Sequence, residues 1–225
     1  MESKRIAGEK ALEYVQDGMT LGLGTGSTVY WTIVKLAERV KEGLRVRCVS
    51  TSNDTERLAA SLGITLIGID RIDELDLTID GADEADPALN LIKGGGGALL
   101  REKMVASISK RLIIVADETK YVDELGKFPL PVEIVTFGWE TTMRQLSKAY
   151  PCTPVLRMKD NVPFVTDNGH YIADCRFTAI PGPERIHSEL NTIPGVVENG
   201  LFVHMADTLI IGRSDGRTEI RTRGR

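Results

Sequence analysis

Cysteine is scarce in this sequence and follows no pairing pattern. The three cysteines among 225 residues are Cys48, Cys152 and Cys175, an odd number without a CxxC spacing. That usage argues against a disulfide framework, so we expect free thiols in a reducing cytoplasm. Cys48 and Cys175 lie in strand-like segments, which predicts small core residues in preference to nucleophiles.

Long apolar runs are also missing. The longest, such as residues 112–116, are far too short to cross a bilayer. Residues 1–15 lack the apolar core of a signal peptide and predict an amphipathic helix. We therefore expect a cytoplasmic protein that does not contact a membrane.

The sequence has no excess of basic residues. Its 28 Lys and Arg residues are interspersed with 32 Asp and Glu residues, for a net charge of −4. Nucleic-acid binding needs a basic face, so we expect no nucleic-acid partner. The basic stretch at 221–225 is short and typical of a solvated chain end.

Histidine is equally sparse, and this bears on the acidic stretch at 80–86. That stretch, DGADEAD, holds four acids, whereas His170, His187 and His204 all lie in the second half of the chain. Binding of Mg²⁺ through oxygen atoms alone stays open, as does a solvated acidic loop. General acid/base use suits the neighbouring lysine better, so we expect no metal and no cofactor.

Strands and helices alternate through the first half of the chain. Apolar periodicity predicts buried strands between amphipathic helices, an arrangement typical of an α/β protein with a Rossmann-like, mostly parallel sheet covered by helices on both faces. The helices are expected at 6–16, 29–40, 54–63 and 98–108, and the strands at 19–22, 45–52, 64–70, 75–83 and 111–118.

The pattern changes after residue 127, where FPLP marks a boundary. Strands are expected at 132–137, 153–159, 170–177 and 196–203, and helices at 139–149 and 183–191. The order β-α-β-β-α-β is ferredoxin-like, so we predict an inserted α+β domain at 128–203. Residues 1–127 and 204–225 then form the Rossmann-like domain, because we expect the segments after 204 to return to the first sheet as one or two strands.

Polar segments follow several predicted strands, at 25–28, 50–54, 80–83 and 117–120. They could share one cleft, because ligands bind beyond the carboxyl ends of parallel strands. The segment GLGTGST (22–28) is not a dinucleotide fingerprint, since Ser27 stands where the last glycine is required, and no lysine makes it a Walker A loop. A phosphate cradle around Ser27 and Thr28 and a tight turn with a helix cap both fit.

Four consecutive glycines at 94–97 follow Lys93 and precede a helix. Glycine costs roughly 0.5–1 kcal/mol in regular structure, so the run suggests close approach of the backbone to a ligand. A flexible linker fits poorly, because a strand and a helix flank the run closely. The helix should bury Leu100, Met104 and Ile108 and turn Glu102 toward the glycines, which suits proton removal from carbon with the oxyanion held by N–H groups.

Taken together, the motifs closely resemble ribose-5-phosphate isomerase, type A. The matching segments are 22–28, 50–52, 80–84, 93–103, 116–120, 125–133, 165–169 and 193–202. They span nearly the whole chain in the family's order and spacing, whereas residues 150–163 and the C-terminal RTRGR depart from the family pattern.

The resemblance implies that the chain interconverts D-ribose 5-phosphate and D-ribulose 5-phosphate in the non-oxidative pentose phosphate pathway. It also implies a homodimer or homotetramer without a metal. Glu102 would move a proton between C2 and C1, Asp80 and Lys93 would handle ring opening and hydroxyl protons, and Asp83 would position hydroxyls. Main-chain N–H groups of residues 93–96 would hold the enediolate.

The implied substrate-binding set comprises Thr25, Gly26, Ser27, Thr28, Asp80, Gly81, Ala82, Asp83, Lys93, Gly94, Gly95, Gly96 and Lys120. Within it, Ser27, Thr28 and Lys120 would bind the phosphate, with Lys4 and Arg5 as weaker candidates. The main alternative is a non-catalytic sugar-phosphate sensor, which would not need Glu102 beside Lys93. An acyl- or CoA-transferase relative, with a carboxylate nucleophile, is a third hypothesis.

Overall fold

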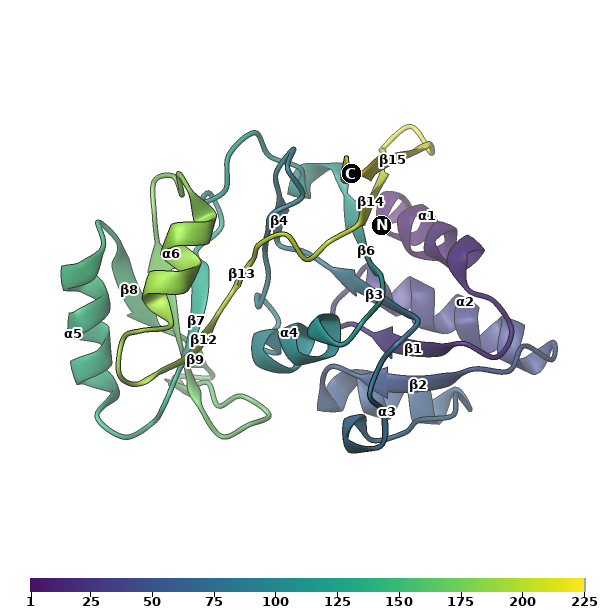
Figure 1. The fold of residues 1–225 in the computed structure, drawn as a ribbon, viewed down its shortest axis with the longest axis horizontal. Coiled ribbons are helices and arrows are strands. Elements are labelled where there is room, and N and C mark those ends of the chain that lie inside the picture. The colour runs from purple at the N-terminus through teal and green to yellow at the C-terminus, as the bar shows by residue number, and fades with distance from the viewer. Residues whose placement is uncertain (225) are drawn as a thin grey trace.

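The computed structural model of the chain describes residues 1–224, and its largest element is a six-stranded sheet in the order β15-β14-β6-β3-β1-β2 (Figure 1). Neighbouring strands run parallel except β14 and β15, which form an antiparallel hairpin at one edge. The predicted Rossmann-like sheet, including the return of the last two strands, is confirmed. The strands are β1 (Thr20–Leu23), β2 (Arg47–Ser50), β3 (Leu77–Gly81), β6 (Leu112–Asp117), β14 (Thr208–Gly212) and β15 (Thr218–Thr222).

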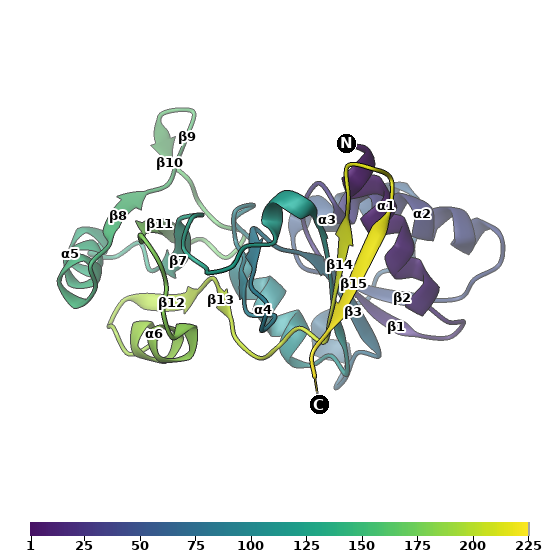
Figure 2. The same cartoon turned by 90° about the horizontal axis from the view of Figure 1, so that it is seen from above.

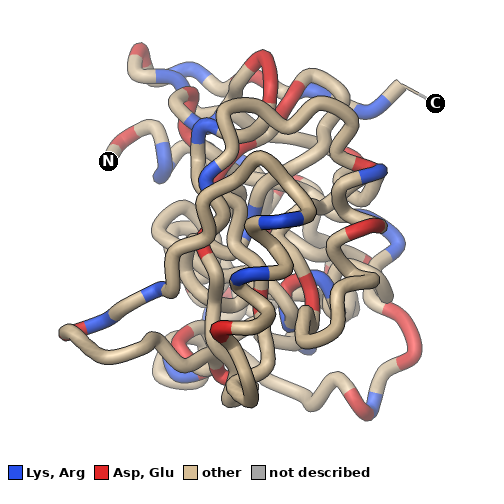
Figure 3. Tube along the Cα trace, turned by 90° about the vertical axis from the view of Figure 1, so that its left-hand side faces the viewer, with Lys and Arg blue, Asp and Glu red and all other residues tan. Residues whose placement is uncertain are grey.

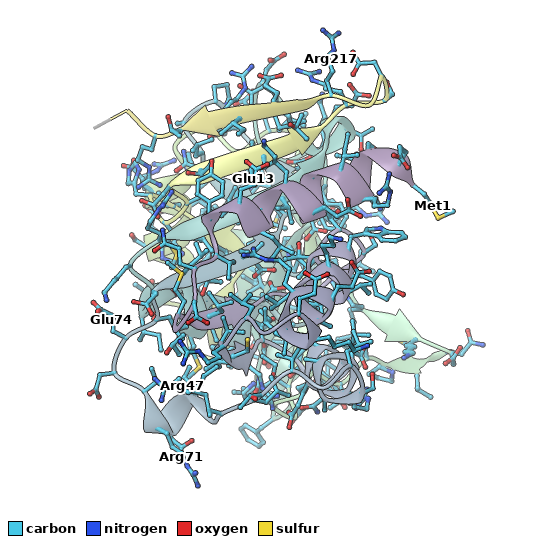
Figure 4. The ribbon with its side chains drawn as sticks, turned by 90° about the vertical axis from the view of Figure 1, so that its right-hand side faces the viewer. Met1, Glu13, Arg47, Arg71, Glu74 and Arg217 are labelled. Carbon is cyan, nitrogen blue, oxygen red and sulfur yellow. The ribbon has the colours of Figure 1, made fainter. Side chains whose placement is uncertain are left out.

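Helices cover both faces of this sheet because alternate residues of a strand point to opposite sides. In β6, Ile113 and Val115 pack into one core with α1 and α2, whereas Leu112 and Ile114 pack into another beside α4. Figure 4 shows α1 lying across the sheet, with Arg217 at the tip of the β14–β15 hairpin. The helices are α1 (Glu2–Lys10), the 3₁₀ turn η1 (Ala11–Tyr14), α2 (Val29–Lys41), α3 (Asn53–Ser61) and α4 (Leu99–Ser107).

The strand expected at 64–70 is wrong. The segment makes a single parallel bridge, Cys48 to Leu66, and then turns into the short 3₁₀ helix η2 (Ile69–Arg71). Ile67 N–H still donates to the Cys48 carbonyl at 2.9 Å, but the chain leaves the edge of the sheet at Gly68. The first helix also begins earlier than expected, at Glu2.

A second, antiparallel sheet has the order β12-β7-β11-β8 and lies beside the first (Figure 1). Its connections, β7-α5-β8-β11-α6-β12, confirm the ferredoxin-like arrangement. Apolar residues of α5 and α6 share one core with β7 and β11. The elements are β7 (Leu130–Ile134), α5 (Trp139–Ala149), β8 (Thr153–Leu156), β11 (Tyr171–Arg176), α6 (Pro183–Leu190) and β12 (Val196–Asn199).

Two predicted strands of this part are each divided in the structure. The strand expected at 153–159 ends at Leu156, and β9 (Met158–Lys159) instead pairs with β10 (Val162–Pro163) in a projecting hairpin (Figure 2). The strand expected at 196–203 breaks at Gly200, after which β13 (Leu201–Phe202) joins β5 (Leu91–Ile92) and β4 (Glu84–Ala85).

The division into 1–127 with 204–225 and 128–203 stays a prediction. β13 lies inside the second range, yet it pairs with β5 of the first. Viewed from the side of the second sheet, acidic and basic residues are interspersed along the trace (Figure 3). Cys48 and Cys175 are buried, as expected. Over residues 1–224, no helix is long and apolar enough to cross a membrane.

Candidate active site

The carboxyl ends of β1 and β3, the loop after β6 and the glycine run before α4 meet around a cavity of about 130 Å³. All residues of the predicted substrate-binding set line it except Asp80, which is fully buried against Lys93. The lining residues are Lys4, Thr25, Gly26, Ser27, Thr28, Gly81, Ala82, Asp83, Lys93, Gly94, Gly95, Gly96, Glu102 and Lys120. The sequence prediction thus identified the residues that surround this cavity.

Segment 50–54, which was also expected in the cleft, does not line this cavity and instead supports Thr25. The Thr25 hydroxyl lies 2.8 Å from the Thr51 hydroxyl and donates to Ser52 Oγ at 2.8 Å. Thr55 Oγ1 donates to the Gly24 carbonyl at 2.8 Å. These buried hydroxyls fix the turn after β1, and so fix one wall of the cavity.

One lysine and two carboxylates form the centre of the site. Lys93 Nζ lies 2.9 Å from Asp80 Oδ2 and 3.3 Å from Glu102 Oε2, and it donates to the Gly81 carbonyl at 2.6 Å. At most 5% of any of the three charged side chains is exposed. β3 places Asp80, β5 ends just before Lys93, and the first turn of α4 carries Glu102.

Burial sets the protonation of this cluster. Burial raises the pKa of Glu102 to about 8, with Asp80 adding to the rise and the Lys93 ammonium opposing it. Burial alone would lower the pKa of Lys93, but Asp80 and Glu102 outweigh it and raise that pKa to about 12. Lys93 is therefore a fixed cation near neutral pH, whereas Glu102 titrates there and can both take up and release a proton.

Backbone donors hold Asp80 in place. Its Oδ1 accepts from Thr25 N–H at 3.1 Å and from Gly81 N–H at 2.7 Å, which leaves Oδ2 toward Lys93. Because a Cβ on Gly24 would collide with this carboxylate, glycine is required there for close approach. The turn after β1 and the end of β3 are thereby joined at the carboxylate.

Within residues 1–224, two backbone N–H groups of the glycine run that lines the cavity have no acceptor. Gly95 N–H donates to Asp83 Oδ2 at 2.7 Å, whereas over residues 1–224 no protein acceptor is bonded to the N–H of Gly94 or Gly96. Gly94 has a φ of 104°, which favours glycine. The expectation that the Lys93 main chain also serves is wrong, because its N–H donates to the Gly200 carbonyl at 2.9 Å.

The opposite end of the cavity has hydroxyls and lysines beside the start of α2. Lys4 Nζ donates to Ser27 Oγ at 2.8 Å, Thr28 is the residue before the helix, and Lys120 closes the side. A helix N-terminus with nearby cations suits an anion. Arg5, a weaker candidate, is instead bonded to Glu2 and Glu9 on its own helix.

The buried face of α4 is not the one that the apolar pattern predicted. Met104 is 47% exposed, and Leu100 and Ile108 are only partly buried. The helix instead buries Glu102 and Lys103 together with apolar neighbours on the same side. Ion pairing makes this possible, since a buried charge needs a partner.

The residues on either side of Glu102 connect α4 to strand β12 of the second sheet and to the loop before β11, which the sequence did not reveal. Arg101 donates to Asn168 Oδ1 and to the Asp167 carbonyl, both at 2.9 Å. Lys103 Nζ donates to the Asn199 carbonyl at 2.6 Å and lies 2.9 Å from Glu198 Oε1. Arg101 and Lys103 lie in the segment REK (101–103), but residue type suggested a role only for Glu102 between them.

The four acids of 80–86 do not form one cluster. Asp80 and Asp83 turn toward Lys93 and Gly95, as described above. Glu84 accepts from the N–H groups of Gly126 and Phe128, at 2.7 and 2.5 Å. Asp86 accepts from Asn90 N–H at 2.8 Å. Each carboxylate therefore has its own donors, and only the first two belong to the site.

Comparison with known proteins shows close relatives over the full length. A chain from Bacillus mycoides named ribose-5-phosphate isomerase A is 57% identical over 220 residues, covering 97% of this chain and 99% of the relative. A protein of the same name from Listeria innocua is 50% identical, covering 98% of each chain.

Solved structures of ribose 5-phosphate isomerases are also similar to this chain over nearly its full length. Ribose 5-phosphate isomerase from Plasmodium falciparum matches with a TM-score of 0.97 at 42% identity and full coverage of both chains. A D-ribose-5-phosphate isomerase in complex with phospho-erythronic acid matches with a TM-score of 0.94 at 40% identity, covering 98% of this chain and 97% of that one. The family model for ribose 5-phosphate isomerase A (phosphoriboisomerase A) matches residues 47–216. The chain belongs to the ribose 5-phosphate isomerase A family.

Proposed function

We propose that the chain interconverts D-ribose 5-phosphate and D-ribulose 5-phosphate, with Glu102 carrying the proton. The activity follows from the family, and the residue roles below are our assignment. The observation that carries the assignment is the buried Glu102 carboxylate, which lines the cavity 3.3 Å from Lys93 Nζ. A sensor without chemistry has no need of such a costly buried charge, so the geometry favours the enzyme.

Ring opening comes first, because the furanose form has no carbonyl. Lys93 lines the cavity and lies 2.9 Å from the buried Asp80 carboxylate, so we assign this pair to ring opening: the ammonium stabilises the departing ring oxygen while the proton of the anomeric hydroxyl passes to that oxygen. Asp83, at the rim of the glycine run, is placed to orient hydroxyls of the open chain.

Glu102 then takes the proton from C2 of the aldehyde, and the electron pair moves toward the carbonyl oxygen on C1. The same carboxylate returns the proton to C1, while the proton of the C2 hydroxyl passes to the C1 oxygen. A single base suffices because the two carbons are adjacent. A pKa of about 8 favours proton abstraction more than that of an ordinary glutamate.

The enediolate needs fixed donors in a site that excludes water. Gly94 and Gly96 line the cavity and have N–H groups that bond no acceptor within residues 1–224, and the Lys93 ammonium supplies positive charge. The phosphate would lie at the α2 end, with Ser27, Thr28, Lys120 and Lys4. Phospho-erythronic acid, the ligand of one relative, should bind here too, since its carboxylate resembles the enediolate oxygens.

The test is isomerisation in deuterated water. Ribose 5-phosphate should give ribulose 5-phosphate labelled at C1, and Glu102→Gln should lower turnover by about 10²–10⁴-fold, the usual contribution of a positioned base. Glu13→Gln changes an exposed glutamate of η1 and is the matched control (Figure 4). Near-normal turnover in Glu102→Gln would remove that residue from the mechanism, and binding without turnover by the unaltered protein would support the sensor.

Three further expectations belong with this function. Three free, buried cysteines fit a reducing cytoplasm. A homodimer or homotetramer is expected from the family resemblance, and light scattering would distinguish the two. We also propose that residues 128–203 are an inserted domain, with residues 1–127 and 204–225 forming the catalytic one.

A further inference from the structure

An arginine from the second sheet reaches the outer side of the glycine run. Arg157 lies in the link between β8 and β9, and its Nη1 donates to the carbonyls of Gly94, at 2.8 Å, and Gly95, at 3.1 Å. Its side chain is only 15% exposed. It does not line the substrate cavity, so a direct contact with the sugar phosphate is not its role.

The guanidinium is itself held firmly. Arg157 Nε and Nη2 donate to the two carboxylate oxygens of Asp174 in β11, at 2.9 and 2.5 Å. This paired geometry fixes the plane of the guanidinium and aims the remaining nitrogen at the glycines. The main chain adds a further restraint, because Phe164 N–H donates to the Arg157 carbonyl at 2.9 Å.

The same unit contacts the run a second time. Phe164 follows the β9–β10 hairpin, and a Cβ on Gly97 would lie 2.5 Å from its ring. Arg157 and Phe164 therefore lie at the two ends of the β9–β10 hairpin, which projects in Figure 2, and both contact the glycine run.

Peptide geometry converts this contact into an effect on the cavity. In a trans peptide the carbonyl of one residue and the N–H of the next point in opposite directions. The peptide between Gly94 and Gly95 is already held on both sides, because the Gly94 carbonyl also accepts from Gly97 N–H at 2.9 Å and Gly95 N–H donates to Asp83. Holding the Gly95 carbonyl outward directs the free N–H of Gly96 away from Arg157 and toward the cavity.

Glycine makes this restraint necessary. Without a Cβ, a glycine peptide can rotate at little steric cost, and a rotated peptide would present a carbonyl to the enediolate instead of an N–H. We propose that Arg157 is a positioning residue that fixes the peptide between Gly95 and Gly96, whose carbonyl accepts from no other donor within residues 1–224, and thereby keeps the N–H of Gly96 aimed at the enediolate. The proposal rests on the enediolate-binding role assigned to the glycine run above.

Lysine is a poor substitute at this position. Arginine's planar fork bonds a carboxylate through two nitrogens and has a third left for the carbonyls, whereas lysine is a point charge on a flexible stem. Arg157→Lys should therefore restore charge but not peptide orientation. The Arg157→Lys variant therefore distinguishes positioning of the glycine peptides from a general electrostatic effect of one cation near the site.

The experiment compares Arg157→Met and Arg157→Lys with Arg144→Met, an exposed arginine of α5 whose side chain, within residues 1–224, bonds only Thr141. Turnover of Arg157→Met should fall at least about 10-fold, part of the roughly 10²–10³-fold that loss of one oxyanion donor costs. KM for ribose 5-phosphate should change by less than about 3-fold, since ground-state binding is largely unaffected. Arg144→Met should match the unaltered protein.

Inhibition distinguishes orientation from folding. Arg157→Met should weaken inhibition by 4-phospho-D-erythronate about 10-fold or more, while inhibition by inorganic phosphate stays unchanged, because only the former probes the N–H donors. Unchanged turnover and unchanged inhibition by both probes would overturn the proposal, as would equal weakening of both probes. Full activity of Arg157→Lys would also contradict it.

A second variant guards against misfolding. Asp174→Asn keeps the arginine but weakens the hydrogen bonds that orient its guanidinium. This variant should therefore show a smaller loss of turnover and of inhibition by 4-phospho-D-erythronate, at an unchanged melting temperature. Normal inhibition in that variant would count against the proposal. If Glu102→Gln keeps its turnover, the proposed chemistry fails, yet the distinct response to the two inhibitors would still report on the orientation of the glycine peptides.

Discussion

The pKa of Glu102 gives a prediction that can be worked through in numbers. Abstraction of the C2 proton requires the ionised carboxylate. With a pKa of about 8, roughly one Glu102 in ten is ionised at pH 7 and about nine in ten at pH 9. An ordinary glutamate would be ionised throughout this range.

The sign and size of the effect follow. A base whose pKa is raised is increasingly active as the pH rises, so kcat/KM should increase about 10-fold from pH 7 to pH 9 and then level off. The substrate contributes little to this change, because the second pKa of a phosphate monoester is about 6. Lys93 contributes little as well, since its pKa of about 12 lies above the range.

The assay is initial-rate isomerisation between pH 7 and pH 10 at constant ionic strength and at substrate concentrations below KM. Asp80→Asn should move the midpoint to lower pH, because the Asp80 carboxylate contributes to the raised pKa of Glu102. The maximum kcat/KM of this variant should also be lower, but the midpoint of the pH profile does not depend on that maximum. A kcat/KM that is flat between pH 7 and pH 9 would refute the argument, and so would an unmoved midpoint in Asp80→Asn.

Two other predictions concern the glycine run and metals. Gly97→Ala should lower the free energy of unfolding by about 1–3 kcal/mol, because its φ is +83° and the new Cβ would press on Phe164. Gly216→Ala, with a similar φ of +85° but open space, measures the strain alone, and equal losses in urea unfolding would contradict the steric part. Treatment with EDTA should leave turnover unchanged, since Lys93 supplies the fixed cation, and a loss restored by Mg²⁺ would contradict this.

The sheet and the cavity could be predicted because their signals are local. Runs such as residues 112–116 are apolar throughout, and polar residues such as Asp80 and Ser27 follow strands directly. In a parallel sheet the ends of these strands lie together, whatever separates them in the chain. The meeting of Asp80 with Lys93 and Glu102 follows from that rule and from the short distance along the chain.

The buried face of α4 could not be predicted in the same way. Apolar periodicity assumes that charged residues face water, but Glu102 is buried against Lys93, and Lys103 is buried against Glu198, which is far along the chain. Lys103 shows this most clearly, since its partner Glu198 is 95 residues away. Met104 is turned outward as a result.

Arg157 lay beyond sequence reasoning for a related reason. It falls in a stretch that departs from the family pattern, and its acceptors are 62 and 63 residues earlier. The break between β8 and β9 at this residue also divides what hydropathy presents as one strand. Only the folded chain shows that the break directs a side chain toward the first sheet.

The two tethers that flank Glu102 have a consequence for the chain as a whole. Arg101 and Lys103 bind two separate segments of the smaller unit, at Asp167 with Asn168 and at Glu198 with Asn199, so α4 is attached to that unit on both sides of Glu102. Excising the ferredoxin-like segment would remove both anchors of the proton carrier at once. The ferredoxin-like segment looks separable in the topology, but it holds the helix that carries Glu102.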